Sequence, residues 1–318
     1  MPADETEMLK VETRSLGRSE LRVSQVGLGC DNFGDPLGVD ESVDIVRRAY
    51  DLRVRFFDTA DAYGDGRSEE FLGKALGGLP RSEVVIATKF GSALSGAIAT
   101  PGGASPEYIR SAVNGSLRRL GTDYIDLYQL HEPDPKTPLD DTLGALNDLV
   151  DKGKVRVLGC SNLSASEVRA SAGTQWPARF ESIQFMWNLL ERGHEADRLP
   201  AAQECGMSVL PWFPLAGGLL TGKYARGQDF PPDSRYERMR DRIGFLAGEA
   251  VFERLERLRS VAEASGHTLL EAALGWLGSR GGVACVMPGA MNVAQVEANV
   301  AAASATIADD VLAALDAV

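Results

Sequence analysis

The sequence Phe56-Phe57-Asp58-Thr59-Ala60-Asp61-Ala62-Tyr63-Gly64 decides the fold and indicates where the chemistry lies. Two aromatic residues end an apolar run typical of a buried strand, and Asp58 stands where that strand should end. Tyr63 follows beside a glycine that permits a turn. The next two apolar runs end in Lys89 and His131. Three successive strands would therefore bring Asp58, Tyr63, Lys89 and His131 to one end of a sheet, where they could carry general acid catalysis.

Apolar runs alternate with amphipathic segments along most of the 318 residues. This alternation implies parallel strands joined by crossover helices. Eight such units in a chain of this length predict an α/β fold of the (β/α)8 barrel type. We expect one domain over residues 1–318, with a flexible tail at 1–13, a hairpin at 14–24, a mobile loop at 91–105, a last strand at 283–287 and extra helices at the C-terminal end. The expected helices are 40–53, 68–77, 106–120, 139–152, 164–172, 197–206, 249–265, 268–278, 293–302 and 307–316.

Two glycine-rich stretches could be mistaken for nucleotide-binding motifs. A doubly wound sheet is the structural alternative to the barrel, but Gly27-x-Gly29-x-x-Asn32 lacks the third glycine of its phosphate loop. The stretch 217–224 resembles a P-loop, except that Tyr224 replaces the serine or threonine that would hold magnesium. Nucleotide hydrolysis is therefore not expected. A glycine-rich stretch that contains Lys223 can still wrap a pyrophosphate.

In a barrel, the residues that follow each strand meet at one face. Nearly all of them here are polar or chemically capable: Cys30, Asp31, Asp58, Tyr63, Lys89, His131, Ser161, Asn162, Gln184, Trp212 and Gly289.

Tyr63 is the candidate proton donor of this group. A phenol has a reference pKa of ~10, which is too high for easy proton donation at neutral pH. The Lys89 ammonium at ~4 Å would stabilise the phenolate by ~4 kcal/mol, or roughly three pKa units. Asp58 would keep that lysine charged, and His131 could contact the other side of the phenol. On spacing alone, Asp58 and Lys89 could equally form a structural ion pair beside an ordinary loop tyrosine.

Other kinds of site find little support in the sequence. Asp58, His131 and Asp134 make a weak metal set, because no two histidines have ligand spacing, and we expect no metal. No Gly-x-Ser-x-Gly motif supports a serine hydrolase. The net charge of −12 argues against nucleic acid and anionic membranes as partners. Four scattered cysteines and an acidic start without an apolar core indicate a cytoplasmic protein.

The chain resembles the aldo-keto reductase superfamily over roughly residues 14–300. The stretch 56–64 is close to the first signature of that family, and the runs that end in Lys89 and His131 fall where its lysine and histidine lie. Further matches cover its cofactor-binding stretches, at 159–162, 184–190, 212–224 and 288–290, together with Gln295 and Asn299.

The resemblance implies a (β/α)8 barrel that reduces a carbonyl with NADPH, with Asp58, Tyr63, Lys89 and His131 as the catalytic tetrad. It implies that Ser161, Asn162 and Gln184 hold the nicotinamide carboxamide and that Trp212 stacks on the ring. The full set of cofactor residues would be Gly29, Cys30, Asp31, Asp58, Ser161, Asn162, Gln184, Trp212, Phe213, Pro214, Leu215, Ala216, Gly217, Lys223, Arg235, Gly289, Met291, Gln295 and Asn299. The substrate would meet Asn32, Phe33, Tyr63, His131 and Trp187.

Two departures from the family pattern concern the choice of cofactor. Met291 stands where the family often has arginine, serine or threonine to meet the adenosine 2′-phosphate, and Ala298 stands where an acidic residue is frequent. Lys223 and Arg235 remain as candidate phosphate partners. We therefore expect an NADPH-dependent reductase of a small aldehyde, ketone or keto-sugar, with NADH as an open option. The alternatives are an NAD-dependent sugar dehydrogenase and a nicotinamide-sensing subunit like the potassium-channel β subunits.

Overall fold

The computed structural model describes residues 11–92, 103–232, 234–238 and 248–318. The expected tail lies largely outside these ranges, and its last residue, Thr13, already belongs to a strand. Most of the expected loop 91–105 also lies outside them. No helix within the described part of the chain is both long enough and apolar enough to cross a membrane.

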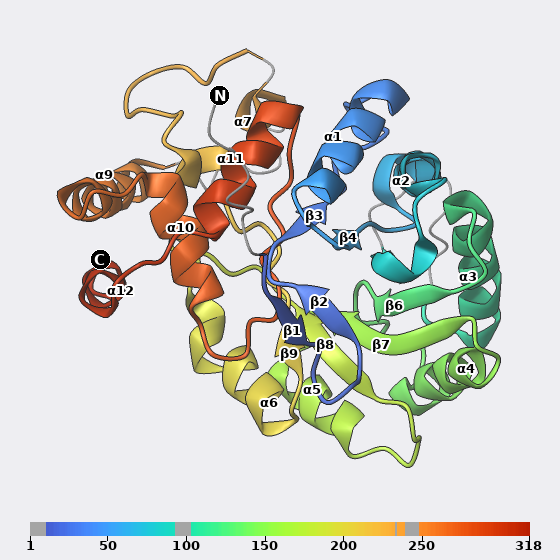
Figure 1. Ribbon diagram of the computed structural model, residues 1–318. Helices are drawn as coiled ribbons and strands as arrows, with labels where there is room; N and C mark the ends of the chain where they lie inside the picture. The colour runs from blue at the N-terminus through green and yellow to red at the C-terminus, as the bar shows by residue number, and fades with distance from the viewer. Residues whose placement is uncertain (1–10, 93–102, 233, 239–247) are drawn as a thin grey trace.

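A small antiparallel hairpin precedes the main sheet. It consists of β1 (Thr13–Ser15) and β2 (Arg22–Ser24), as the sequence predicts. Its apolar residues Leu16, Leu21 and Val23 are buried in one cluster with side chains that fill the barrel interior. The hairpin lies across the barrel opening in Figure 1 and closes the end at which the strands begin.

Seven parallel strands form the main sheet in chain order, which confirms the predicted fold class. Each strand pairs with the next one along the chain through crossover helices, so the sheet curls into a barrel (Figure 1). The strands are β3 (Gly27–Gly29), β4 (Phe56–Asp58), β5 (Val85–Phe90), β6 (Ile125–Leu130), β7 (Val155–Ser161), β8 (Phe180–Gln184) and β9 (Ser208–Val209).

The expected eighth strand at 283–287 closes the ring through isolated bridges. Val283 pairs with Val209 of β9, and Val286 pairs with Val26 just before β3. The N–H of Gly27 donates to the carbonyl of Val286 at 2.9 Å. Proline at position 288 has no N–H to extend the ladder, which limits this segment to short contacts.

Helices surround the sheet as the predicted alternation requires (Figure 1). Local sequence explains several of their starts: Ser105 caps the helix that opens with Pro106, and Ser164 forms a capping box with Glu167. The helices are α1 (Val39–Asp51), α2 (Arg67–Leu76), α3 (Pro106–Leu120), α4 (Leu139–Asp151), α5 (Ala165–Ala172), α6 (Arg198–Glu204), α7 (Arg235–Arg238), α9 (Glu249–Ala264), α10 (Leu269–Gly278), α11 (Val293–Ala303) and α12 (Asp309–Asp316).

Strand alternation divides the core into an inner and an outer layer. In β5, Val85 and Ala87 belong to the interior cluster, whereas Ile86 and Phe90 pack outward against the helices. A period of two then directs Lys89 inward at the end of the strand and Thr88 outward. The same rule directs Asp58 of β4 inward, so the two charged residues face each other inside the barrel.

Candidate active site

Lys89 is the centre of a buried polar network at the carboxyl ends of the strands. Its ammonium group donates to Asp58 Oδ2 at 2.6 Å, to the carbonyl of Thr59 at 2.9 Å and to the Tyr63 hydroxyl at 3.2 Å. These acceptors use all three N–H groups of a side chain that is only 1% exposed. Burial would lower the pKa of Lys89, but Asp58 and Tyr63 outweigh burial and hold it above its usual range, so the lysine is charged.

Two glutamines hold the other oxygen of Asp58. Gln129 and Gln184 donate to Oδ1 at 3.0 and 2.8 Å, and Gln184 also donates to Gln129 Oε1 at 2.9 Å. Gln184 was expected to hold a nicotinamide amide, whereas its NH₂ group here supports Asp58. Our sequence interpretation missed this role of Gln129, although the signal was present: Gln129 is the penultimate residue of β6, pairs in register with Lys89 of β5 and shares its inward direction.

His131 lies against Tyr63. Their ring centroids are 5.7 Å apart in an edge-to-face arrangement. Burial, with a smaller effect of the Lys89 charge, lowers the pKa of His131 to about 3, so the imidazole is neutral. Its Nδ1 atom is buried without a hydrogen-bond partner among the described residues. The four predicted catalytic residues are therefore gathered at one place.

The electrostatics of Tyr63 differ from our expectation. We expected Lys89 to lower the pKa of the phenol. Burial instead raises the pKa of Tyr63 above its usual range, and Lys89 opposes that effect only in part. Our expectation left out the cost of removing the phenolate from water. The sequence does not show how deeply the Tyr63 hydroxyl is buried.

A chain of hydrogen bonds links the expected nicotinamide residues to the catalytic group. Trp212 donates from Nε1 to Asn162 Oδ1 at 3.1 Å, and Asn162 donates from Nδ2 to the carbonyl of His131 at 3.2 Å. Asn162 has a φ of 61°, a conformation that few residues other than glycine adopt. Ser161, at the end of β7, is buried beside it. Unusual backbone of this kind is common at functional sites.

The segment after Trp212 contains the highest concentration of such backbone. Phe213, Ala216, Gly217 and Gly218 all have positive φ, at 60°, 47°, 65° and 98°. A Cβ atom at Gly218 would lie 2.9 Å from the Lys223 ammonium nitrogen. The segment thus offers a bare backbone cradle beside a cation, which suits a phosphate group. The neighbouring Pro214 is buried and Leu215 is partly exposed.

Two arginines of α7 lie beside the segment after Trp212, and we call residues 213–232 and 234–238 the wall. The Tyr236 hydroxyl ties the helix to the carbonyl of Ala216 at 3.2 Å. Arg235 pairs with Asp31 at 2.5 Å, and its Nε is buried without a partner among the described residues. Arg238, which our sequence interpretation missed, lies 4.0 Å from the sulfur of Met291. A positively charged side chain therefore lies beside Met291, whose own side chain has no group that can bind a phosphate.

The start of α11 shapes the facing wall. Gln295 accepts from the N–H of Met291 at 2.9 Å, and Asn299 donates to the carbonyl of Gly289 at 3.2 Å. The first strand contributes Gly29, whose N–H donates to Pro288, and Cys30, which is buried. These contacts bring the predicted cofactor residues of β3, of residues 288–291 and of α11 together.

Three predicted substrate residues are placed differently from the rest. Phe33 is 0% exposed and Trp187 is 1% exposed, and both belong to the outer core. Trp187 donates from its indole to Glu195 and packs edge-on against Trp276. Asn32 is buried and reaches toward the carbonyl of Ala290. The structure therefore does not present the two aromatic side chains to a ligand, because packing against the helices encloses them.

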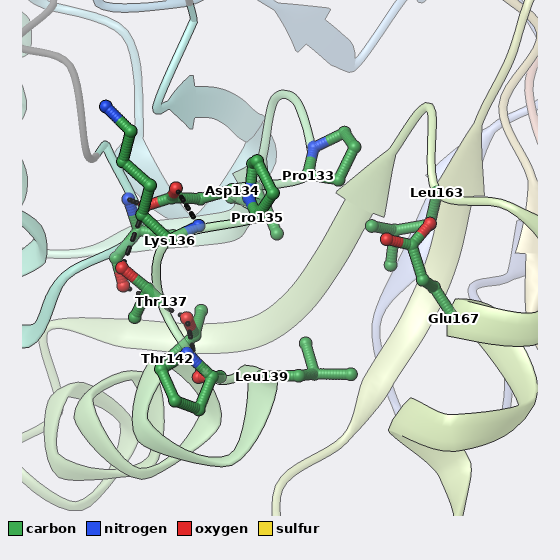
Figure 2. Close-up of a pocket in the computed structure, with 12 residues that line it drawn as sticks. Pro133, Asp134, Pro135, Lys136, Thr137, Leu139, Thr142, Leu163 and Glu167 are labelled. Carbon is green, nitrogen blue, oxygen red and sulfur yellow. Dashed lines mark hydrogen bonds between the residues drawn. The ribbon is translucent and has the colours of Figure 1, made fainter.

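A separate cavity of about 340 Å³ lies between the sheet and the starts of α4 and α5 (Figure 2). Its floor includes Leu130 and Leu163, which point outward from the barrel. Asp134 holds its rim through the backbone of Lys136 and the hydroxyl of Thr137. The tetrad does not line this cavity.

The geometry agrees with comparisons to known proteins. The sequence model of the aldo/keto reductase family matches residues 25–318. This chain belongs to the aldo/keto reductase family. It is therefore an oxidoreductase whose family reduces carbonyl groups.

Named relatives span most of the chain. It is 31% identical over 94% of its length to "Probable aldo-keto reductase 1" of Glycine max, covering 86% of that protein. It is 35% identical over 84% of its length to "Versiconal hemiacetal acetate reductase" of Aspergillus parasiticus, covering 85% of that protein. It is 33% identical over 92% of its length to "Probable voltage-gated potassium channel subunit beta" of Oryza sativa subsp. japonica, covering 91% of that protein.

Proposed function

We propose that the protein reduces an aldehyde, ketone or keto-sugar to an alcohol with NADPH, and that Tyr63 donates the proton. The observation that carries this proposal is the charged, buried Lys89 at 3.2 Å from the Tyr63 hydroxyl. A lysine that formed only a structural ion pair with Asp58 would not need to face a phenol. Its position suits the stabilisation of negative charge that develops on that oxygen.

The residues present fit a nicotinamide dinucleotide. When bound, this cofactor supplies a hydride for the carbonyl carbon. Trp212 and Asn162 would hold the nicotinamide end, and the cradle at 216–218 with Lys223 would hold the pyrophosphate. The unpartnered Arg235 Nε and the strained backbone of the cradle support this assignment.

The proton would move in a defined order. Tyr63 keeps its proton in the resting site, because burial raises the pKa of the phenol. As negative charge builds on the carbonyl oxygen, Tyr63 transfers the proton, and Lys89 stabilises the phenolate that remains. The neutral His131 orients the carbonyl oxygen from the other side. Asp58 and its two glutamines keep the lysine charged and in place.

Two measurements on Tyr63→Phe test this role. We expect reductase activity to fall by a factor on the order of 10²–10⁴. NADPH binding, followed by quenching of Trp212 fluorescence, should stay within about twofold, since the lost hydroxyl lies at the proton-transfer site. Full activity in the variant would remove Tyr63 from the mechanism. No binding of either NADPH or NADH to the natural protein would overturn the proposal as a whole.

Preference for NADPH rests on the basic side chains of the adenosine end. Arg238 lies 4.0 Å from the sulfur of Met291, the position where the family often meets the 2′-phosphate, and Arg235 belongs to the same short helix. A tighter affinity for NADPH than for NADH is therefore expected. Equal or tighter NADH binding would favour the alternative direction, an NAD-dependent oxidation of sugars.

The relative from rice supports a second candidate, a nicotinamide-sensing regulatory subunit. The two candidates differ in turnover. An enzyme should show steady-state oxidation of NADPH with at least one member of a panel of aldehydes and keto-sugars. A sensor should bind NADPH tightly, complete a single slow turnover at most, and change its affinity for a partner with the redox state. We also propose a cytoplasmic location, which the four buried free cysteines support.

A further inference from the structure

A second group of buried ionisable residues lies behind the tetrad, between the sheet and helices α2 and α3. We call it the outer acid cluster, and it consists of Asp61, Glu69, Tyr108 and Arg119. Asp61 is 1% exposed and Glu69 is 0% exposed. Carboxyl groups are rarely buried so completely without a structural or functional reason. None of the four takes part in the proposed chemistry.

The two carboxyl groups are partnered unequally. Glu69 accepts from Thr88 at 2.6 Å and pairs with Arg119 at 2.6 Å. Asp61 accepts a hydrogen bond from the Tyr108 hydroxyl to Oδ2 at 3.1 Å, and the backbone N–H of Ala62 has a smaller effect that also favours the ionised form. Its Oδ1 atom is buried and, among the residues that the structure describes, has no partner. A charged oxygen in that position would lack the donors that it needs.

The charges of the cluster favour the binding of one proton by a carboxyl group. Two carboxylates face a single guanidinium, so one negative charge is in excess when both acids are ionised. Burial, followed by the charge of Glu69, raises the pKa of Asp61 to about 7, against the opposing effects of Tyr108 and Arg119. From β6, the hydroxyl of Tyr128 also faces the cluster. Asp61 can therefore change its charge near neutral pH.

Asp61 contacts the segments that carry Tyr63 and Lys89, the two residues of the proton-donating pair. Its own N–H donates to the carbonyl of Lys89 at 3.0 Å. Tyr63 follows two residues later in the same tight turn. On the other side, the Tyr108 hydroxyl that binds Asp61 also receives the N–H of Gly91, just beyond Lys89. Asp61 therefore lies within the turn closed by the Tyr63 N–H and the Ala60 carbonyl, and it contacts the end of the strand that carries Lys89.

We infer that Asp61 is a positioning residue whose protonation state sets the placement of Tyr63 against Lys89. The neutral carboxyl group fits its buried site and holds the turn. The ionised group has an unsatisfied Oδ1, and the turn loosens as that oxygen seeks a donor. The effect on catalysis rests on the proposed function, whereas the coupling between Asp61 and Tyr63 does not.

The coupling predicts an inflection in the pH dependence of the rate that titration of Tyr63, Lys89 or His131 does not explain. Tyr63 and Lys89 have raised pKa values, and the pKa of His131 is about 3, so none of the three titrates near neutral pH. The rate of hydride transfer should fall about tenfold between about pH 6 and about pH 8, as Asp61 with a pKa of about 7 loses its proton.

Fluorine NMR tests the coupling without any need for activity. With 3-fluorotyrosine incorporated at position 63, the resonance should titrate with a midpoint at about pH 7 in the otherwise natural protein. In Asp61→Asn it should not titrate there, because the amide cannot ionise. Asp65→Asn is the matched control, since it makes the same change at an exposed position of the same turn. It should titrate as the natural protein does.

Tyr108→Phe separates a proton switch from a merely structural role. The Tyr108 hydrogen bond favours the ionised carboxylate and so lowers the pKa of Asp61. Its removal should move both the fluorine midpoint and the kinetic inflection to higher pH. A structural defect alone would lower the rate at every pH and leave the midpoint unchanged.

The outcomes divide cleanly. A midpoint lost in Asp61→Asn and raised in Tyr108→Phe supports the inference. A resonance that titrates equally in Asp61→Asn, or that is flat in the natural protein, overturns it. If no carbonyl compound is reduced, the proposed function fails, and the fluorine titration still decides whether Asp61 and Tyr63 are coupled.

Discussion

The tetrad and the wall formed by residues 213–232 and 234–238, which we propose faces the adenosine end of the cofactor, are held in place by different interactions. The tetrad lies at the ends of buried strands, where strand alternation sets the direction of Asp58 and Lys89. The ion pair between these two residues, together with the amides of Gln129 and Gln184, then holds them in position. The wall contains only a distorted 3-10 stretch at Ala216–Thr221 and the short helix α7 among its described residues. Strained backbone and aromatic packing hold it, including the contact of Tyr224 with Tyr236, whose rings are 5.4 Å apart. We therefore expect the tetrad to respond to changes of charge and the wall to respond to changes of shape.

Among the substitutions that test this difference, Lys89→Met should have the largest effect on stability and activity. It leaves the buried Asp58 without its cation, which should cost about 3–5 kcal/mol of stability, and it should abolish measurable reduction. Chemical denaturation and a reductase assay measure the two effects. The double variant with Asp58→Asn should recover most of the stability and none of the activity. A double variant as unstable as the single one would show that the ion pair is not the cause.

Gly218→Ala probes the wall by shape alone. The new Cβ would displace the flexible end of the Lys223 side chain, and alanine would have to adopt a φ of 98°, so we expect a loss of about 1–2 kcal/mol and weaker NADPH binding. Gly227→Ala is the control, because Gly227 also has positive φ, at 70°, but has open space around it. It should lose only about 1 kcal/mol and keep its NADPH affinity. Equal losses at both positions would mean that the contact with Lys223 is unimportant.

Arg238→Ala tests whether the wall selects the cofactor. We expect NADPH affinity to fall about tenfold, or about 1.4 kcal/mol, with NADH affinity unchanged. Fluorescence titration with both cofactors measures the difference. Arg110→Ala, which removes an exposed arginine of α3, should change neither affinity. A parallel loss for both cofactors would show that Arg238 supports the fold of the wall and does not read the 2′-phosphate.

The smallest expected effect concerns acid stability at the tetrad. The pKa of His131 in the folded protein is about 3, below its usual value of 6.5, so its contribution to stability is present above pH 6.5 and is lost as the pH falls. Between about pH 7 and about pH 6 the loss should be below about 1 kcal/mol. The difference in stability between the natural protein and His131→Gln should change by this amount over the same pH range, and thermal unfolding of both proteins at several pH values measures it. For His267→Gln this difference should not change.

The same comparison explains what could be predicted from the sequence. Periodicity predicted the order of the strands and the grouping of the tetrad, because both follow from local alternation. It did not reveal that Gln184 supports Asp58, since only the folded register brings Gln129 and Gln184 to one carboxylate oxygen. The first helix was expected at 40–53, whereas α1 begins at Val39, after Gly38, and ends at Asp51.

The wall was harder to predict. The cradle and Lys223 could be inferred from their glycines, whereas the place of Arg238 beside Met291 depends on how α7 packs, through Tyr236, onto the segment after Trp212. Phe33 and Trp187 were expected to meet substrate from the family resemblance. Their burial depends on distant helices, which no local pattern shows.

The barrel closes through bridges between Val26 and Val286 and between Val209 and Val283. The first of these joins positions about 260 residues apart in the chain. On a ribosome, the early strands would therefore emerge and pair long before the last segment is made, and their open edge would stay unpaired until synthesis is nearly complete. A nascent chain of this fold thus spends most of its synthesis with one exposed strand edge, the state in which aggregation is most easily nucleated and in which a chaperone would be of greatest use.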